Sequence, residues 1–399
     1  MISPVDALSR LGTPPAVGAL AGEDAVYVVG GAVRDVLLGR EPRELDFVVV
    51  GDAVAVARRA AARLGGRVTV HDRFGTATVI APQTTFDLAG SRRERYERPG
   101  ALPEVELGAP LVDDLARRDF SVNAMALHLV DGEIVEWPGA RADLRTRRLR
   151  VLHDRSFVDD PTRLLRLARY AARLGFEPQL QTDELAAAAV AGGAVDTVTG
   201  PRLGAELRLL LREPQPEALV ALARHRVGAA VLRGAFEVRP ELVERAIALC
   251  PPDGRADLAA LAVCCGGFDP RALAATLDRL EFEAPDRDAV VAAATSGLAL
   301  VDMPDSKLWR LLRRARPETV AVAGARGGPE AEAVARRWLG DVRRRRLAIN
   351  GNDLVAAGLS GPPVGAGLDA AMEAMLDGRA PGREEQIAAA LDGAGGERS

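Results

Sequence analysis

Two acidic residues, Glu44 and Asp46, stand at the start of an apolar stretch. The stretch predicts a β-strand over residues 44–50, and alternate side chains of a strand point to the same face. The two carboxylates would therefore converge, and Mg²⁺ prefers such oxygen ligands together with substrate phosphates. A third acid, Asp87, lies in another predicted strand over residues 85–88 and could join them. The alternatives are a solvated strand end for the pair and a structural or salt-bridged acid for Asp87.

A pair of glycines precedes these acids. Gly30 and Gly31 follow the apolar run Val26–Val29, which predicts a strand, and they precede a short predicted helix. Glycine lets backbone amides approach an anion closely, and the first amides of a helix can point at a phosphate. Taken alone, this pattern favours a structural turn. Beside paired carboxylates it predicts nucleotidyl transfer, in which metal ions activate a hydroxyl and stabilise the leaving pyrophosphate.

The elements that would position these residues change in type along the chain. Strand patterns are confined to the first 150 residues, and helical patterns run almost without interruption from about Pro161. We expect a helix over residues 51–66 that ends at its two glycines. Further strands are expected over residues 67–70 and 76–80, and as a hairpin formed by residues 128–130 and 134–136. The pattern predicts an α+β protein with a long helical C-terminal part, in about two or three domains.

Composition limits the function classes. The 399 residues carry a formal net charge of −4, and the basic residues are arginines except for Lys307. This charge argues against a protein that is basic throughout, but a local basic stripe would suffice to bind nucleic acid. The three cysteines show no metal-binding spacing, which predicts reduced thiols. No signal peptide and no apolar run of membrane-spanning length is evident, so we expect a cytoplasmic protein that does not enter a membrane.

Several segments, in order, resemble one known family. GGAVRD (Gly30–Asp35), the acidic pair in ELDFVV and RRDFSVNAMAL (Arg117–Leu127) are similar to the tRNA nucleotidyltransferase/poly(A) polymerase family of bacterial and eukaryotic type. Further similar segments are Asp159–Phe176, Gly200–Leu211 and Ile349–Leu368. The resemblance therefore runs nearly from end to end.

The resemblance implies a domain order and an activity. It implies a catalytic head related to DNA polymerase β nucleotidyltransferases, then a helical neck with a base-selecting helix, a helical body and a tRNA-binding tail. The expected bounds are residues 1–150, 151–215, 216–340 and 341–399. The implied reaction uses Mg²⁺ to add CMP and AMP from CTP and ATP to the 3′ end of tRNA, with release of pyrophosphate. The oligomeric state is left open.

The family motifs also assign roles to residues. Glu44 and Asp46 would be the metal ligands, and Asp119 and Asn123 would shape the site from the start of a helix. Arginines of the RRDF motif could instead be a surface pair beside a helix start. The residues expected at the nucleotide are Gly30, Gly31, Arg34, Asp35, Arg118, Asp119, Asn123, Asp159, Asp160, Arg163 and Arg166.

Base selection is expected from Asp160 and Arg163, which would share a helix face with Arg166 one turn later. An aspartate accepts hydrogen bonds and an arginine only donates them. Such a pair matches the exocyclic amine and ring nitrogen of cytosine or adenine and rejects guanine and uracil. A mismatch would cost roughly 1–3 kcal/mol. The alternative is an exposed i,i+3 ion pair, worth only about 0.2–0.5 kcal/mol.

Arginines elsewhere could bind RNA. Arg92, Arg93 and Arg95 surround Tyr96 in a segment that resembles the family's flexible loop, which helps the site change from CTP to ATP. The loop has its full length, which argues against an enzyme that adds only CC. Arg343 and Arg344 could contact tRNA phosphates. In both places the alternative is a solvated charged face.

Two departures from the family pattern keep other activities open. Glu44 replaces the usual aspartate, which moves the carboxylate by about one methylene. The motif at residues 136–144 reads EWPGARADL, whereas the family usually has Asp-Pro-x-Gly-Gly-x-x-Asp-Leu there, a motif thought to couple head and neck. These departures motivate one alternative, a silent tRNA-binding relative. Within the same chemistry, the alternatives are an A-adding enzyme with a separate CC-adding partner and a poly(A) polymerase.

Overall fold

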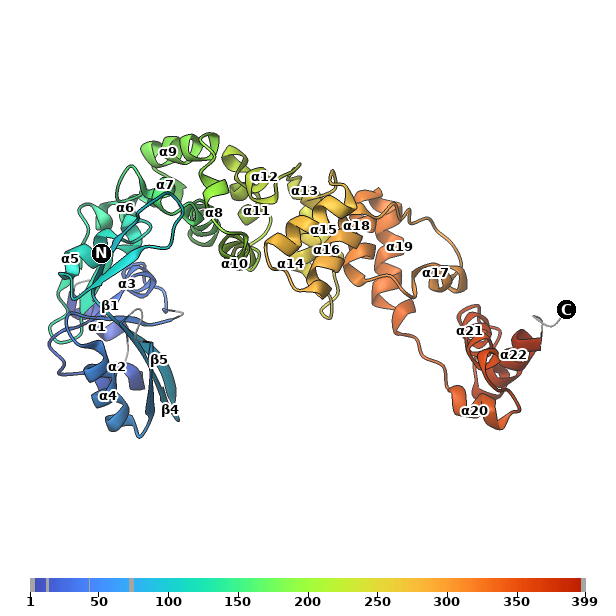
Figure 1. Cartoon of the computed structure of the whole chain (residues 1–399). Coiled ribbons are helices and arrows are strands. Elements are labelled where there is room, and N and C mark those ends of the chain that lie inside the picture. Colours follow the sequence, from blue (N-terminus) through green and yellow to red (C-terminus); the bar gives the residue numbers. More distant parts are fainter. Residues whose placement is uncertain (1–3, 12–13, 43, 72–74, 396–399) are drawn as a thin grey trace. The chain divides into compact units, whose positions relative to one another are not determined.

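The computed structural model describes residues 4–395 except 12–13, 43 and 72–74 (Figure 1). The chain divides into two compact units. The first joins Met1–Glu213 to Arg224–Val231, and the second joins Pro214–Ala223 to Leu232–Ser399. All described strands belong to the first unit, so the expected α+β class with a helical C-terminal part is confirmed. The finer subdivision into head, neck, body and tail remains a prediction.

A seven-stranded sheet forms the centre of the first unit, with the strand order β3-β4-β5-β2-β1-β8-β9. All neighbouring strands run antiparallel except β2 and β5, which are parallel. The other predicted strands are confirmed with small shifts of their ends, but the strand predicted over residues 128–130 is wrong in its bounds, since β8 shares only His128 with that range. The strands are β1 (Val26–Val29), β2 (Asp46–Val49), β3 (Arg67–His71), β4 (Thr76–Ala81), β5 (Thr84–Gly90), β8 (Met125–His128) and β9 (Ile134–Glu136).

Helices cover the sheet because its strands bury apolar side chains on both faces. The predicted helix over residues 51–66 is α4 (Ala53–Leu64), which packs on β3, β4 and β5. The Asp52 side chain caps its first turn by accepting a hydrogen bond from the Ala55 amide at 2.9 Å. Gly65 ends the helix with a φ of 64°, as the glycine pattern predicts. On the other face, Val48 packs in a cluster with Leu115 of α5 (Leu111–Ala116). The other head helices are α1 (Pro4–Leu11), α2 (Pro15–Leu20), α3 (Gly31–Leu37) and α6 (Ala140–Thr146).

Three local predictions in the head need correction. β2 begins at Asp46, so Glu44 lies in the segment before the strand. The arginine-rich loop forms a two-stranded antiparallel ribbon of β6 (Arg92–Arg95) and β7 (Glu104–Leu107), in which Glu106 of β7 pairs with Arg93 of β6 at 3.1 Å. Asn123 ends a 3-10 turn, η2 (Ser121–Asn123), that leads into β8 rather than into an α-helix.

The part of the first unit that follows α6 is mostly helical. Its long helix α8 (Thr162–Leu174) packs against α10 (Gly200–Leu210). Phe120, which precedes η2, meets Tyr170 of α8 edge to face with ring centroids 5.9 Å apart. The remaining elements are β10 (Arg148–Leu149), α7 (Ser156–Asp159), β11 (Glu177–Pro178), α9 (Leu180–Ala191), η3 (Ala194–Thr197), η4 (Arg224–Arg226) and α12 (Val227–Leu232), whose last residue belongs to the second unit.

The second unit consists of helices packed in pairs. Gly324 of α18 lies so close to α19 that an added Cβ would be 2.5 Å from Ala335 Cβ, which explains a glycine inside a helix. None of the helices in the described ranges is long and apolar enough to cross a membrane. The helices are α11 (Glu217–Ala223), α13 (Pro240–Leu249), α14 (Ala256–Cys264), α15 (Pro270–Arg279), α16 (Ala284–Thr295), α17 (Asp305–Leu312), α18 (Pro317–Arg326), α19 (Gly328–Gly340), η5 (Val342–Arg344), α20 (Gly351–Ala356), α21 (Pro362–Leu376) and α22 (Arg383–Gly395).

Candidate active site

A cavity of about 390 Å³ opens between the start of α3 and the neck helix α8. It brings together the second glycine of the pair, the following Arg34 and Asp35, and both predicted metal ligands. Tyr170 and two arginines of α8 form the opposite wall. The lining residues are Gly31, Ala32, Arg34, Asp35, Arg40, Glu41, Glu44, Asp46, Arg169, Tyr170, Arg173, Leu174 and Leu209. Sequence-distant residues with phosphate-binding and metal-binding chemistry therefore share one cavity.

The carboxylates of Glu44 and Asp46 are both exposed in this cavity. The parallel pairing of Phe47 with Leu88 places Asp46 beside Asp87 on the next strand. Partial desolvation by the surrounding protein raises the pKa of the Asp46 carboxyl. The positive charge of Arg118 lowers this pKa, and repulsion by Glu44 and Asp87 raises it. A divalent cation would relieve this repulsion, so the donor set fits Mg²⁺.

Asp87 stands apart from the two lining acids. It does not line the cavity, and its Oδ1 accepts a hydrogen bond from the Thr78 hydroxyl at 2.5 Å. Within the described ranges, no group of three or more His, Cys, Asp or Glu side chains is arranged to hold a metal ion. Four acids line the cavity, Asp35, Glu41, Glu44 and Asp46, and Asp35 pairs with Arg34 at 2.9 Å. The metal-binding roles of Glu44 and Asp46 and the catalytic role of Asp87 stay predictions.

Gly30 has a backbone conformation that requires glycine. Its φ is 68° and its ψ is −129°, a region that residues with a side chain rarely adopt. A Cβ at this position would lie 3.0 Å from Nη1 of Arg118. The glycine therefore allows the RRDF arginine to approach the β1–α3 turn.

Arg117 and Arg118 are held by a buried acid that the sequence analysis missed. The Asp114 side chain is 0% exposed and pairs with Arg117 at 2.8 Å and with Arg118 at 2.9 Å. Both arginines follow the C-terminus of α5, so the alternative of a surface pair at a helix start is wrong. Burial lowers the pKa of Arg118, and among the described residues its buried Nε has no hydrogen-bond partner. That donor suits an anionic ligand. The i,i+3 and i,i+4 spacing from Asp114 was the signal that could have found it.

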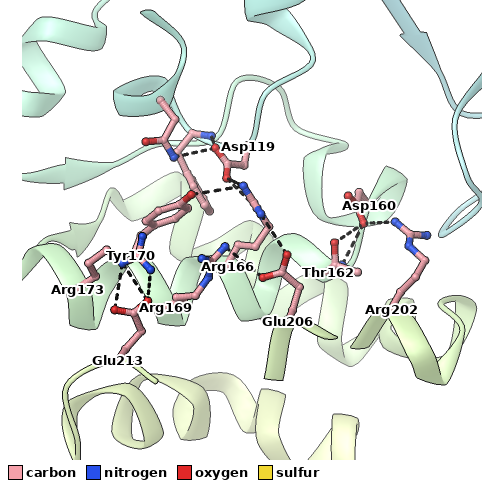
Figure 2. A network of polar contacts seen from close by, with 12 residues as sticks. Asp119, Asp160, Thr162, Arg166, Arg169, Tyr170, Arg173, Arg202, Glu206 and Glu213 are labelled. Atoms are coloured by element: carbon pink, nitrogen blue, oxygen red, sulfur yellow. Dashed lines mark hydrogen bonds and ion pairs between the residues drawn. The ribbon is translucent and has the colours of Figure 1, made fainter. Parts of the chain in front are cut away.

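A polar network connects the head to the neck (Figure 2). Arg34 donates from Nη1 to Oδ1 of Asn123 at 2.6 Å, and Asn123 donates from Nδ2 to Oδ1 of Asp119 at 2.9 Å. Arg166 donates to Oδ2 of Asp119 from Nε at 2.8 Å and from Nη2 at 2.6 Å. Burial alone would raise the pKa of Asp119, but Arg166 and the Asn123 hydrogen bond outweigh it and lower the pKa to about 2. Four predicted site residues thus act as one connected group.

Figure 2 also shows further residues of the network that sequence reasoning missed. Glu206 pairs with Arg166 at 3.1 Å and with Arg169 at 3.2 Å, and Glu213 pairs with Arg173. Guanidinium carbons of Arg34, Arg166, Arg169 and Arg173 lie 5.0–5.9 Å from the Tyr170 ring centroid. The helical spacing Arg166, Arg169, Tyr170 and Arg173 could have identified this face of α8.

The expected base-selecting pair does not lie on one helix face. Asp160 lies between α7 and α8, where it accepts hydrogen bonds from the Thr162 hydroxyl at 2.6 Å and from Arg202 at 2.9 Å. Arg163 is buried and donates to the Ser156 hydroxyl at 2.6 Å and to a main-chain carbonyl at 2.6 Å. The predicted shared face and the alternative exposed ion pair are therefore both wrong, because Pro161 separates Asp160 from the helix. Asp159 also precedes α8, and its side chain pairs with Arg155 at 3.0 Å. Roles of these residues in base selection remain predictions.

The arginines expected to bind RNA differ in how far they are neutralised. Arg92 pairs with Glu94 at 2.9 Å, and Arg93 pairs with Asp113 at 2.5 Å. The other expected RNA contacts lie on the ribbon and on the second unit. Arg95 and Arg344 are exposed without an ion-pair partner among the described residues, and Arg343 pairs with Asp253. Their contact with RNA stays a prediction.

The chain resembles named proteins over different lengths. Residues 26–150 match the family described as Poly A polymerase head domain. An A-adding tRNA nucleotidyltransferase of Geobacter sulfurreducens is 46% identical over 195 residues, which are 48% of this chain and 22% of that protein. Matches to such relatives cover about half of their length or less. A Multifunctional CCA protein of Xanthomonas campestris pv. campestris (strain B100) is 31% identical over 88% of this chain and 98% of that protein.

The chain belongs to the tRNA nucleotidyltransferase/poly(A) polymerase family.

Solved structures of this family share the fold over nearly the whole chain. An apo CCA-adding enzyme matches with a TM-score of 0.85 and 30% identity, over 98% of this chain and 99% of that chain. A Thermotoga maritima CCA-adding enzyme complexed with tRNA matches with a TM-score of 0.80 and 28% identity, over 98% of each chain. A CCA-adding enzyme complexed with CTP matches with a TM-score of 0.80 and 28% identity, over 98% of each chain. A CCA-adding enzyme complexed with ATP matches with a TM-score of 0.79 and 29% identity, over 96% of this chain and 94% of that chain. The expected relation to this family is confirmed.

The motif that departs from the family pattern keeps a connected structure. Asp143, which matches the family, accepts hydrogen bonds from the Ser121 hydroxyl at 2.7 Å and from Arg150 at 2.7 Å. Glu136, at the first aspartate position, pairs with Arg141 at 2.5 Å. Asp143 thus ties α6 to η2 and to Arg150, and the altered Glu136 ties β9 to α6.

Proposed function

We propose that this protein is a Mg²⁺-dependent nucleotidyltransferase that completes the CCA end of tRNA with CMP and AMP from CTP and ATP. The observation that carries the proposal is the shared cavity, in which Glu44 and Asp46 face Gly31 and Arg34. Transfer of a nucleotidyl group needs little covalent chemistry from protein and depends on positioning and charge stabilisation. Full-length similarity to a Multifunctional CCA protein supports the same reading. The reaction would take place in the cytoplasm.

The side chains of the cavity suit separate parts of this reaction. Glu44 and Asp46 would hold Mg²⁺, which when bound neutralises triphosphate charge and lowers the pKa of a bound hydroxyl. The guanidinium of Arg34, which lines the cavity, and that of Arg118, which lies against Gly30, would hold phosphate oxygens. Asp119 would keep Arg166 and Asn123 in place, so that the α8 face and the β1–α3 turn present a fixed wall to the nucleotide.

Addition of the terminal A alone is the second candidate. The chain is 46% identical over 195 residues to an A-adding enzyme. A CC-adding enzyme is as similar, at 46% over 201 residues, but the full length of the arginine-rich loop argues against addition of CC alone. In that case a separate protein would supply the CC end. The two candidates differ in which RNA ends the protein extends, since an A-adding enzyme acts only on an end that already carries CC.

A primer-extension assay separates these proposals. Three transcripts of one tRNA, ending before the tail, after C and after CC, are each offered CTP, ATP or both with Mg²⁺. Extension of all three to CCA supports the first proposal, and a single A added only to the CC transcript supports the second. Repeated A addition beyond the tail would indicate a poly(A) polymerase. Binding without extension of any transcript would contradict all of these enzymes and indicate a silent tRNA-binding relative.

A further inference from the structure

A hollow of about 410 Å³ on the second unit is lined by tryptophan and arginine side chains alone. Its lining residues are Trp309, Arg313, Arg314, Trp338, Arg343 and Arg346. The hollow lies where α17, α19 and η5 meet. No carboxylate is among the lining side chains, although the chain carries a net charge of −4. Nothing in the proposed catalytic chemistry uses these residues.

The aromatic part of the hollow offers a surface for stacking. Trp309 is half-buried, and the guanidinium carbon of Arg313 lies 4.7 Å from its ring centroid. Trp338 is only 3% exposed, so it supports the wall rather than offering a free face. An indole and a planar guanidinium both stack on nucleobases without regard to base identity.

The charges of the hollow are only partly compensated. Arg313 pairs with Asp369 at 2.5 Å, and Arg343 pairs with Asp253. Among the residues that the structure describes, Arg346 donates to the main-chain carbonyls of Arg343 at 2.8 Å and Arg345 at 2.9 Å and to no carboxylate. Within the described part of the chain, Arg314 has no ion-pair partner, and the same holds for Arg344 next to the hollow. Three exposed guanidiniums thus remain available to an anion.

We infer that this hollow binds one unpaired nucleotide of an RNA. The base stacks on Trp309 and Arg313, and Arg314 and Arg346 hold the adjoining phosphate. RNA is preferred to a free nucleotide because Arg344 extends the uncompensated charge beyond the hollow, as a continuing phosphate backbone requires. The inference rests on the proposed function, in which the RNA is a tRNA. It adds a base-stacking site on a unit that carries none of the catalytic residues.

The test compares RNA binding by four forms of the full chain. Wild type, Trp309→Leu, the double variant Arg314→Gln/Arg346→Gln, and the control Arg336→Gln are titrated with a full tRNA transcript ending in CC, without CTP or ATP. Arg336 is a matched control because it is exposed and lies two residues before Trp338, on the other side of α19. Trp309→Phe keeps a stacking surface and serves as the rescue variant.

We expect Trp309→Leu to weaken binding about tenfold, within the roughly 5- to 100-fold range of one stacking contact, and Trp309→Phe to restore most of it. The double arginine variant should also reduce the slope of log Kd against log salt by about 1 to 2. Arg336→Gln should bind as wild type does. In turnover assays KM should rise and kcat should stay unchanged. Unfolding curves that match wild type exclude misfolding as the cause.

Equal tRNA binding by wild type, Trp309→Leu and the double variant would overturn the inference. Saturation of the hollow by ATP or CTP alone, seen as a tryptophan fluorescence change that Trp309→Phe abolishes, would overturn the assignment to RNA. Failure of the proposed function looks different: wild type would not extend any transcript, although the variants would still bind tRNA more weakly than wild type.

Discussion

Asparagine at position 119 would remove the negative charge at the centre of the network between head and neck. Asp119 is 6% exposed and receives two hydrogen bonds from Arg166 and one from Asn123. Breaking a buried pair outright costs about 3–5 kcal/mol. Arg166 would keep its ion pair with Glu206 at 3.1 Å, so we expect Asp119→Asn to lower the free energy of unfolding by somewhat less, about 2–3 kcal/mol.

The pKa of Asp119 leads to a similar magnitude. A fall from 3.8 in the unfolded chain to about 2 in the folded protein corresponds to about 2 kcal/mol. Because the folded pKa is the lower one, this stabilisation is complete above about pH 4 and is lost as the pH falls towards 2. The stability difference between wild type and Asp119→Asn should therefore be constant from pH 5 to 8 and should shrink below pH 4.

Calorimetry of the full chain provides the assay. For a unit of this size, about 1 kcal/mol shifts the melting temperature by about 2–4 °C, so Asp119→Asn should lower it by about 4–12 °C at pH 7. Glu177→Gln is the control, because it breaks an exposed pair with Arg224 and should change the melting temperature by no more than about 2 °C. A shift below 1 °C for Asp119→Asn, or a difference as large at pH 3 as at pH 7, would refute the reasoning.

Three further substitutions test separate parts of the site. Asp46→Asn should lower the rate of single-turnover extension by at least roughly 10²- to 10³-fold. Thermal stability should be unchanged or slightly raised, since the substitution removes repulsion by Glu44 and Asp87. A near-normal extension rate would show that Asp46 is not a metal ligand. Gly30→Ala should lower the free energy of unfolding in urea by about 1–3 kcal/mol, because alanine rarely adopts the positive φ at this position. The control Gly18→Ala, in α2 with open space around it, should leave the stability unchanged or raise it. Equal effects of the two substitutions would contradict the strain at Gly30. Asp160→Asn should raise UMP and GMP incorporation relative to CMP and AMP by roughly 5- to 100-fold; unchanged selectivity would show that Asp160 serves only to cap α8 and hold Arg202.

The sequence predicts those features of the fold that depend on neighbouring residues. The run of apolar residues at Val26–Val29 forms β1 with those bounds, and the glycine after α4 ends that helix. Local patterns suffice at such places because strand propensity and glycine capping act within a few residues. They fail for the ribbon of β6 and β7, whose pairing depends on residues that lie about ten positions apart.

The candidate site was predictable in its chemical types but not in its pairing. The motifs identify Asp160 and Arg163 as a pair. In the folded protein Asp160 instead accepts a hydrogen bond from Arg202, 42 positions away, and Arg163 donates to Ser156 and to a main-chain carbonyl. The spacing of Asp114 from Arg117 and Arg118 suits ion pairs, but its burial is not visible in the sequence, because a buried acid and an exposed acid look alike there. Which carboxylate meets which guanidinium is decided by the three-dimensional packing of segments far apart in the chain, and a spacing rule does not contain that information.

The bonds that join Asn123 and Asp119 to Arg166 bear on how this protein can be divided or recombined. The recognised head region ends at residue 150, but the partners of Asp119 lie on α8 and those of α8 lie on α10 and at Glu213. A fragment cut at residue 150 would leave the Asp119 carboxylate without Arg166 and would lack the α8 wall of the cavity, so it would not be a smaller working version of the site. Chimaeras with a homologue should follow the same logic: an exchange point after Glu213 keeps co-adapted partners together, whereas one at residue 150 mixes them.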